Sequence, residues 1–470
     1  MKTALLLFDC DLRVSDNAAF FAAAKNNEAI LPLYILDEKN KRPLGAAAKW
    51  FLHHALQSFS KLLHKKYGLN LILKKGDSLK ILREILAKEK IAAIYFNNAV
   101  EHYNIRLHEE IKNLAEEKNI AVFSHKSQTL FEPTQIKTTS KSYFKIFSPF
   151  WRVCLKNYKE VGAVLPAPKA TFKQAAHDFK NDDLNLLPQK NWAKKFEKYW
   201  EFDDKKIRQK LAAFLEKQIH DYLKNRDFPS IQGTTTISPY LHFGMISIRE
   251  IFDYTIMQNN SAGQQKFLSS IGWREFNLHL LYHFPQMAEK NFNSYFDRFA
   301  WQENPELFEK WKKGQTGYPI VDAAMRELWE TGFMHNRPRM IVASFLVKHL
   351  LIDWRIGEKY FWDCLVDADL ANNAMNWQWV AGSGADAAPY YRIFNPSRQS
   401  VRFDAKGDYI RKWVPELKKM PDKLIHSPWE TSANELKKYD VILGKTYPQP
   451  IVNHEAARDA AMMLYRLLRH

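Results

Sequence analysis

The first third of the chain alternates short apolar runs with longer amphipathic stretches. The apolar runs have the length of buried strands, and the stretches between them carry apolar residues at three- and four-residue steps, as one face of a helix does. The runs lie at residues 4–8, 29–36, 69–74, 91–97 and 120–124, and the longest helical stretches span 45–67 and 100–119. This alternation predicts a Rossmann-like α/β domain with a five-stranded parallel sheet over residues 1–130.

The pattern changes twice beyond residue 130. Residues 131–200 are rich in lysine and proline and have no sustained period, so we expect a linker. From residue 201 to 470, apolar residues recur at helical spacing, which predicts an all-α domain. The predicted helices are 205–224, 247–258, 264–282, 319–331, 338–352 and 455–468.

Composition narrows the class of protein. The formal charge is +17, and phosphate groups bind such a chain favourably because counterions are released, so a polyanionic partner is expected. Cys10, Cys154 and Cys364 are far apart, which argues against a disulfide framework or a zinc site, and no metal site is predicted. The N-terminal apolar run is broken at Asp9 and is too short for a signal peptide or a membrane span. We expect a cytoplasmic monomer without membrane segments.

Several ordered strings carry a resemblance to a known family. They are GYPIVDAAMREL at 317–328, MHNRPRM at 334–340, SFLVKHLLIDWR at 344–355, the run from Asp367 to Pro396, DLRVSDN at 11–17 and YPQPIV at 447–452. Together they resemble the DNA photolyase/cryptochrome family, and most of all the bacterial class I photolyases for cyclobutane pyrimidine dimers. The resemblance implies an amino-terminal α/β domain, a long linker and a helical domain that binds FAD.

The segment RDFPSIQGTTTISPYLHFG at 226–244 is similar to the family segment that meets the flavin pyrophosphate. Hydroxyl groups donate hydrogen bonds to phosphate, although a Thr/Ser run before Pro239 is by itself often only a helix cap. Asn373 falls at the position that faces flavin N5, where Asn suits a fully reduced flavin and Cys or Asp is typical of several cryptochrome groups. The implied FAD contacts are Tyr222, Thr234, Thr235, Thr236, Ile237, Ser238, Arg274, Asn336, Asp367, Asp369 and Asn373.

The resemblance places Trp273 against a lesion that is flipped out of the DNA, where an aromatic ring offsets the loss of base stacking. Ser270 stands where DNA-repairing relatives carry a Glu that hydrogen-bonds the lesion. Losing one such contact costs about 1–3 kcal/mol, so we expect weakened repair. Met340 argues against repair of the (6-4) photoproduct. The implied DNA contacts are Arg226, Ser270, Trp273, Asn336, Arg337, Met340, Trp379 and Gln399.

Three of these assignments have plainer alternatives in the residues alone. Arg274 and Glu275 could equally form an ion pair on a helix surface, and Asn336-Arg337 before Pro338 could simply begin a helix. Trp301, Trp354 and Trp377 match the three tryptophans that carry electrons between the flavin and the surface in the family. The alternative is that all three serve only core packing. We predict that these tryptophans and Asn373 carry the electron chemistry.

The amino terminus departs from the family pattern. Relatives commonly read FRxDLR, and here Asp9 takes the place of the first Arg. Some relatives hold a folate antenna with an Asn-Glu pair, and the aligned residues are Tyr103 and Asn104. The resemblance therefore does not imply folate binding. A second antenna chromophore is possible, and its identity is unknown.

The function implied by the resemblance is light-dependent repair of cyclobutane pyrimidine dimers in DNA, by electron transfer from excited reduced FAD. One alternative is a cryptochrome-like blue-light photoreceptor with weak or no repair activity. Ser270 favours it, whereas Asn373, Met340 and a chain that ends soon after YPQPIV oppose it. The other is a basic nucleic-acid-binding protein without photochemistry, which a colourless preparation would support.

Overall fold

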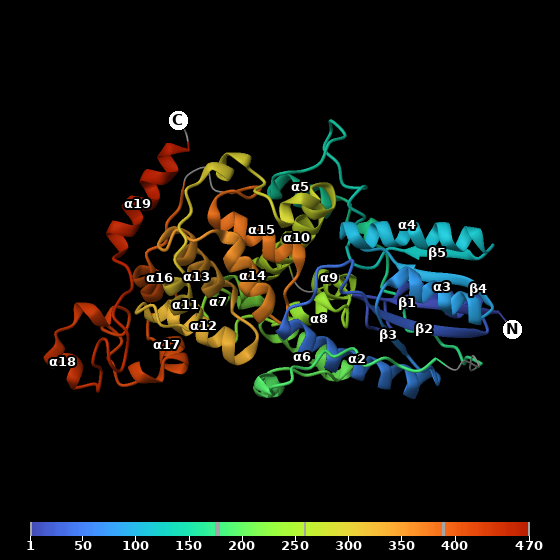
Figure 1. Ribbon diagram of the computed structural model, residues 1–470, viewed down its shortest axis with the longest axis horizontal. Helices are drawn as coiled ribbons and strands as arrows, with labels where there is room; N and C mark the ends of the chain where they lie inside the picture. The colour runs from blue at the N-terminus through green and yellow to red at the C-terminus, as the bar shows by residue number, and fades with distance from the viewer. Residues whose placement is uncertain (1, 174–178, 258–259, 388–390, 469–470) are drawn as a thin grey trace. The chain divides into compact units, whose positions relative to one another are not determined.

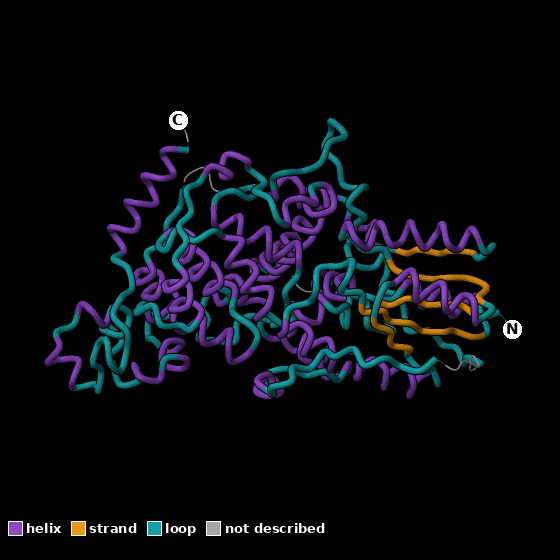
Figure 2. The backbone as a smooth tube through the Cα atoms, viewed as in Figure 1, coloured by secondary structure: helices purple, strands orange, loops and turns teal. Residues whose placement is uncertain are grey.

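The apolar runs of the first third form one parallel sheet in this computed structural model, which describes residues 2–173, 179–257, 260–387 and 391–468. Its strands are β1 (Thr3–Phe8), β2 (Ala29–Leu36), β3 (Ile72–Lys75), β4 (Ile91–Asn97) and β5 (Ala121–His125), in the order β3-β2-β1-β4-β5 (Figures 1 and 2). The central strand β1 pairs with β2 and β4, with Leu5 opposite both Leu31 and Ile94. Such a strand is covered on both faces, which explains its uninterrupted apolar sequence.

Helices cover both faces of the sheet. They are α1 (Ala18–Asn26), α2 (Ala46–Tyr67), α3 (Ser78–Lys88) and α4 (His102–Glu117). Ile85 of α3 and Leu114 of α4 belong to one apolar core with Leu5, whereas Phe20 of α1 packs on Tyr67 of α2 at 5.1 Å between ring centroids. The five-stranded α/β prediction is confirmed.

The rest of the chain is largely helical, as predicted. The helix predicted at 319–331 has the same first and last residues as α12 (Pro319–Thr331). The helix predicted at 205–224 is instead two helices, α6 (Asp204–Lys217) and α7 (Tyr222–Asn225). Position 258 of the predicted helix 247–258 lies outside the described residues. The remaining helices are α8 (Ser238–His242), α9 (Ile248–Ile256), α10 (Ala262–His283), α11 (Pro305–Lys312), α13 (Asn336–Lys348), α14 (Trp354–Cys364), α15 (Leu370–Ala381), α16 (Pro396–Phe403), α17 (Asp408–Trp413), α18 (Ala433–Lys437) and α19 (His454–Leu467).

The predicted linker contains a helix that the sequence pattern did not predict. Helix α5 (Phe147–Lys156) has Pro149 in its first turn. We interpreted the prolines of this region as breaks, but the first four backbone N–H groups of a helix have no intrahelical partner, so a proline there removes no hydrogen bond. The apolar face of α5 buries Phe150 and Trp151.

The chain forms two compact units by its contacts. Unit 1 comprises residues 1–194, 200–220 and 236–285, and unit 2 comprises 195–199, 221–235 and 286–470. Unit 1 therefore holds the sheet together with helices α5, α6 and α8–α10, and unit 2 holds α7 and α11–α19. The boundaries predicted at residues 130 and 200 stay a prediction. No helix among the described residues combines the length and apolarity that crossing a bilayer requires.

A buried carboxylate joins two of the recognised strings within unit 2. Asp322, in the string at 317–328, accepts hydrogen bonds from the Thr316 and Gly317 backbone N–H groups at 2.6 and 3.0 Å. It also accepts one from the Tyr447 hydroxyl, in the string at 447–452, at 2.6 Å. Burying a carboxylate costs free energy unless it accepts hydrogen bonds of this kind. This explains why the two strings carry polar residues inside a core.

Helices α14 and α15 approach closely where α14 has a glycine. A Cβ atom added to Gly357 would lie 2.3 Å from Trp377 Cη2 and 2.6 Å from Leu346 Cδ2. Both distances are shorter than any van der Waals contact. The glycine therefore fixes how near Trp377 lies to α14.

We predict that Gly357→Ala lowers the free energy of unfolding by about 1–3 kcal/mol, because the added methyl group overpacks this crossing. The control is Lys359→Ala, an exposed position on the same helix, which should stay within about 0.5 kcal/mol. Denaturant unfolding measures both. A stabilised Gly357→Ala variant, as helix propensity alone predicts, would contradict the close crossing.

Candidate functional site

The three predicted electron-transfer tryptophans all lie in unit 2, in or against its main core. Trp377 on α15 is 2% exposed, Trp354 at the start of α14 is fully buried, and Trp301 is partly exposed. Trp377 packs on Gly357, one helical turn after Trp354. Gln302, next to Trp301, donates its backbone N–H to the Leu351 carbonyl at 2.8 Å, three residues before Trp354. Two of the three indoles are thus buried in the core and the third lies partly exposed against it, and their order in an electron path stays a prediction.

Asn373 on α15 has its side-chain amide held by Glu358 of α14. The Nδ2 group donates to the Glu358 backbone carbonyl at 3.0 Å and to Glu358 Oε1 at 2.8 Å. Both residues are buried. Because both N–H bonds go to Glu358, the Oδ1 atom is the one that can accept a hydrogen bond from another group. The sequence did not predict Glu358, which lies 15 residues away and belongs to no recognised motif.

The acidic loop before α15 is organised by an arginine that sequence reasoning missed. Arg339 Nη2 donates to both carboxylate oxygens of Asp367, at 2.9 and 3.0 Å, and its Nε donates to the Met334 carbonyl. Asp369 caps α15 by accepting the Asn372 backbone N–H at 2.8 Å. The loop residues are therefore not simply solvated charges, because each carboxylate has a fixed orientation.

The threonine segment is divided between the units. In unit 2, Thr234 and Thr235 follow Gly233, where a Cβ would lie 2.6 Å from the Asn225 carbonyl oxygen, at the end of the helix α7 that begins with Tyr222. In unit 1, Ile237 precedes α8 and Ser238 begins it, so the expected helix start is present.

Thr236 has an uncommon backbone conformation. Its φ is +49°, in the left-handed region that β-branched residues rarely occupy, and its hydroxyl accepts a hydrogen bond from Lys210 Nζ at 3.1 Å. Backbone strain of this kind concentrates at ligand sites, which agrees with the predicted pyrophosphate contact.

Predicted DNA contacts gather around one aspartate in unit 2. Asp227 Oδ1 lies 3.0 Å from Arg337 Nη2 and 3.7 Å from Arg226 Nε. The Arg337 guanidinium also lies 4.2 Å from the centre of the Phe403 ring on α16, the helix that carries Gln399. Asn336 and Arg337 do begin α13, with His335 as its cap, so the plainer alternative for these two residues is correct as a description of local structure. Met340 lies one turn further along the helix.

Trp273 on α10 of unit 1 rests on an aromatic ring from α5. Its ring lies 3.9 Å from that of Phe147 with an interplanar angle of 10°, so the two are stacked. Phe147 thus holds the indole as a rigid platform, and sequence reasoning missed it because its helix was not predicted. Ser270, one turn before Trp273, donates its hydroxyl to the Lys266 carbonyl at 3.1 Å. That bond turns the hydroxyl back onto the helix itself.

Arg274 and Glu275 are not a surface pair. Glu275 is 4% exposed and accepts the Leu130 backbone N–H at 2.7 Å and Arg274 Nη1 at 3.0 Å. Arg274 also donates to the Gln128 carbonyl at 3.1 Å. The pair therefore joins the segment just before the predicted linker to α10. Burial raises the pKa of Glu275 to about 7, against the opposing effect of the Arg274 charge.

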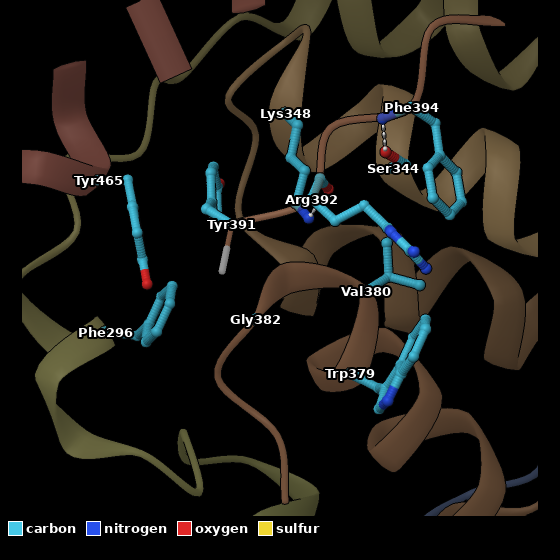
Figure 3. Close-up of a pocket in the computed structure, with 10 residues that line it drawn as sticks. All are labelled: Phe296, Ser344, Lys348, Trp379, Val380, Gly382, Tyr391, Arg392, Phe394 and Tyr465. Carbon is cyan, nitrogen blue, oxygen red and sulfur yellow. Dashed lines mark hydrogen bonds between the residues drawn. The ribbon is translucent and has the colours of Figure 1, made fainter. Parts of the chain in front are cut away.

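An open cleft lies in unit 2 beside Trp379, which donates its indole N–H to the Asp386 carbonyl at 3.1 Å. Figure 3 shows the Arg392 side chain extending past Val380 toward Trp379, and the Tyr391 and Tyr465 rings across the cleft. Lys348 Nζ donates to the Arg392 carbonyl, and burial lowers the pKa of this amine to about 7. The cleft thus combines one guanidinium with aromatic walls, and sequence reasoning predicted only its tryptophan.

The polar atoms around the predicted flavin residues of unit 2 fit a bound polar cofactor. Buried His335 Nε2, Arg337 Nε and Trp377 Nε1 have no hydrogen-bond partner among the described residues. An unpaired buried donor is costly, so a ligand with many acceptor oxygens and nitrogens suits this set. Asn373 Oδ1 adds an acceptor of the kind that a flavin N–H requires.

The residues that depart from the family pattern, Asp9, Tyr103 and Asn104, hydrogen-bond to other side chains of unit 1. Asp9 pairs with Lys41 at 3.2 Å and accepts Asn104 Nδ2 at 3.0 Å, and the Tyr103 hydroxyl donates to Asp37 at 2.8 Å. The two residues that align with the folate ligands are therefore both engaged with carboxylates. The identity of an antenna chromophore stays open.

Two family models match the chain. Residues 4–170 match DNA photolyase, and residues 267–467 match the FAD binding domain of DNA photolyase. The deoxyribodipyrimidine photo-lyase of Agrobacterium fabrum is 43% identical over 100% of this chain and 99% of its own. Cryptochrome-2 of Arabidopsis thaliana is 34% identical over 97% of this chain and 78% of its own. The crystal structure of a bacterial class III photolyase from Agrobacterium tumefaciens has a TM-score of 0.95 at 42% identity, covering 100% of this chain and 98% of that one.

A parallel α/β domain followed by helices that match an FAD-binding domain defines a two-domain flavoprotein. This chain belongs to the DNA photolyase/cryptochrome family. The predicted family, fold class and FAD cofactor are thereby confirmed. The roles of the individual site residues stay predictions.

The pKa of Glu275 gives a prediction for stability against pH. Because this pKa rises from 4.5 in the unfolded chain to about 7 in the folded protein, the folded state retains a proton that the unfolded state releases. The free energy of unfolding therefore falls as pH rises from about 5 to about 7. Between pH 5 and pH 8, the free energy of unfolding should fall by about 1–3 kcal/mol less in Glu275→Gln than in the unaltered protein, as measured by denaturant unfolding.

The control for this prediction is Glu84→Gln, at an exposed position on α3. It should leave the pH profile of the free energy of unfolding as in the unaltered protein. An unchanged profile in Glu275→Gln would show that the buried carboxyl ionises normally.

Proposed function

We propose that this protein is a light-dependent deoxyribodipyrimidine photo-lyase, which repairs cyclobutane pyrimidine dimers in DNA as a cytoplasmic monomer. The observation that carries the proposal is the orientation of the Asn373 amide, whose N–H groups bond Glu358, which leaves Oδ1 as the atom that can accept a hydrogen bond from a cofactor. An acceptor at that place suits the protonated N5 of a fully reduced flavin, the redox state that repair requires.

The residues of the chain supply position and a dry environment for the cofactor. Bound FAD, once reduced and excited by blue light, supplies the electron that splits the cyclobutane ring and receives it back. Trp273, held flat by Phe147, stacks on the extruded pyrimidines. Asn336 and Met340, on α13, are further lesion contacts that the family resemblance implies. Arg226 and Arg337 bind phosphates next to the lesion, which makes binding salt-dependent and nearly independent of sequence.

The buried tryptophans restore the reduced flavin. Trp377, Trp354 and Trp301 pass an electron inward from an external reductant at the surface, and the burial of Trp377 and Trp354 keeps water away from these two indoles while they are oxidised. This role needs three indoles in a row, and the contacts of Trp377 with α14 and of residue 302 with Leu351 support that arrangement.

Within the family, we place the chain beside the class III photolyases. The motifs in the sequence suggested class I, but the 42% identity over the full length to a structure named as class III supports class III instead. The 43% identity to a photo-lyase against 34% to a plant cryptochrome supports repair over a purely signalling role.

One observation favours the second candidate, a cryptochrome-like photoreceptor. Ser270 replaces the lesion-binding Glu, and its hydroxyl is already bonded to the Lys266 carbonyl of its own helix. The lesion therefore lacks one polar partner on this side of the pocket.

The repair experiment uses the chemically reduced protein, an oligonucleotide that contains one dimer, and blue light. We expect repair by the unaltered protein and a roughly 5- to 150-fold higher ratio of repair rate to substrate KM in Ser270→Glu, because one hydrogen bond of about 1–3 kcal/mol is restored. Ser270→Ala is the matched control and should behave like the unaltered protein. Binding of FAD without repair by any variant would favour the photoreceptor.

Trp377→Phe tests the tryptophan chain. The variant should reduce its flavin under light at least 10-fold more slowly than the unaltered protein, because phenylalanine is much harder to oxidise than tryptophan, and it should repair normally once reduced chemically. Trp311→Phe, a fully buried tryptophan in the same core, serves as control and should photoreduce normally. Equal photoreduction in the unaltered protein and Trp377→Phe would refute the assigned path.

A further inference from the structure

A basic turn precedes α5 in unit 1. The sequence from Glu132 to Glu160 contains six Lys and Arg residues between these two glutamates and no other acidic residue. Three of the six, Lys137, Lys141 and Lys145, are exposed and recur every four residues. None of the three forms an ion pair with any part of the chain that the structure describes. Unpaired cationic charge at this density favours a polyanionic partner.

The turn has a defined conformation. Thr138 donates its backbone N–H to the Ser142 carbonyl at 2.9 Å, and Lys141 donates its own to the Thr138 carbonyl at 2.9 Å. Lys141 itself has a φ of +59°, as a tight turn requires. The loop extends from the body of unit 1 just before α5 (Figures 1 and 2). The backbone that carries these lysines is therefore ordered, which lowers the entropic cost of binding a ligand.

Aromatic contacts attach the turn to the helix that carries Trp273. The Tyr143 ring stacks on His283 of α10 at 3.6 Å and 16°, and Lys145 Nζ lies 5.4 Å from the centre of the Phe284 ring. The chain then enters α5, where Phe147 stacks on Trp273. The turn and the lesion platform thus lie along one helix, α10, and are connected through one continuous segment.

The separation along α10 sets the distance to the lesion. His283 lies ten residues after Trp273, which corresponds to about 15 Å along a helix. One strand of B-DNA advances about 3.4 Å per nucleotide, so this distance spans roughly four nucleotides. A strand that stacks its lesion on Trp273 and runs along α10 brings its phosphates within reach of lysine side chains on the turn.

We propose that the basic turn, residues 137–145, binds the DNA backbone about three to five nucleotides from the lesion. This inference rests on the proposed function only for the position of the lesion at Trp273. The turn acts on affinity and not on chemistry, because phosphate contacts hold the strand in place without touching the reacting bases.

The test compares two triple variants with the same net charge. Lys137→Gln, Lys141→Gln and Lys145→Gln together remove the charges of the turn. Lys61→Gln, Lys65→Gln and Lys66→Gln remove three exposed charges from α2 in the same unit. Binding of a duplex with one dimer, and of the same duplex without it, is measured between 50 and 200 mM salt.

The salt dependence of binding should separate the two variants. We expect the slope of log affinity against log salt to fall in magnitude by about 0.9 for each phosphate that the turn no longer neutralises, or by 2 to 3 in all, whereas the α2 variant keeps the slope of the unaltered protein. Over this salt range, each such phosphate changes the affinity ratio by about 3-fold. Equal slopes in the turn variant and the unaltered protein would overturn the proposal, as would equal reductions in both variants.

A second measurement locates the contact. Neutral methylphosphonate linkages replace single phosphates at each position flanking the dimer. Affinity of the unaltered protein should fall about 3-fold or more at low salt for linkages three to five nucleotides away on one side, and the turn variant should show no further decrease there. Additive decreases at those linkages would overturn the proposal.

The repair rate at saturating DNA separates this inference from the proposed function. Both triple variants should repair at the rate of the unaltered protein. If none of the three proteins repairs dimers while the slopes differ as expected, the proposed function fails and the turn stands as a DNA-binding surface. If all three proteins repair dimers and their salt slopes are equal, the DNA contact of the turn is refuted and the proposed function stands.

Discussion

The close crossing of α14 and α15 is the constraint on which the rest of the site depends. Gly357 admits the Trp377 ring where any side chain would collide with it. One residue later, Glu358 holds the amide of Asn373 with two hydrogen bonds. A single helix contact therefore positions both Asn373, which we predict to face the flavin, and Trp377, which we predict to be the first indole of the electron path. Such a contact is rigid because the hydrogen bonds of the amide are buried and the ring is closely packed.

The fold could be predicted from hydrophobic periodicity because its elements are regular. The five strands and the helix at 319–331 were recognisable, since buried parallel strands and amphipathic helices leave unambiguous patterns. Helix α5 was not, because it has ten residues and a proline in its first turn. The break between α6 and α7 was also missed, as helical spacing continues across it.

The site could be predicted from motifs only where a motif supplies the residue. Asn373, Trp377 and Asp367 lie in recognised strings, but their partners Glu358 and Arg339 were not predicted as site residues. Phe147, beneath Trp273, comes from a segment more than a hundred residues away. Long-range pairs of this kind leave no local signal in one sequence, because any polar or aromatic residue at a helical step satisfies the local pattern. The sequence likewise does not show that Glu275 is buried and accepts the Leu130 backbone N–H, since the local pattern fits a surface charge equally well.

The two units carry different parts of the proposed function. Unit 2 buries Trp354, Trp377 and Asn373, and unit 1 presents an aromatic platform with exposed lysines on the turn before α5. The most direct test of the central claim is the fluorescence lifetime of the reduced flavin in the purified protein, with and without bound DNA. Electron donation to a stacked dimer predicts a markedly shorter lifetime with dimer-containing DNA than with the same sequence undamaged. Equal lifetimes with the two DNAs, at concentrations where both are bound, would contradict the account.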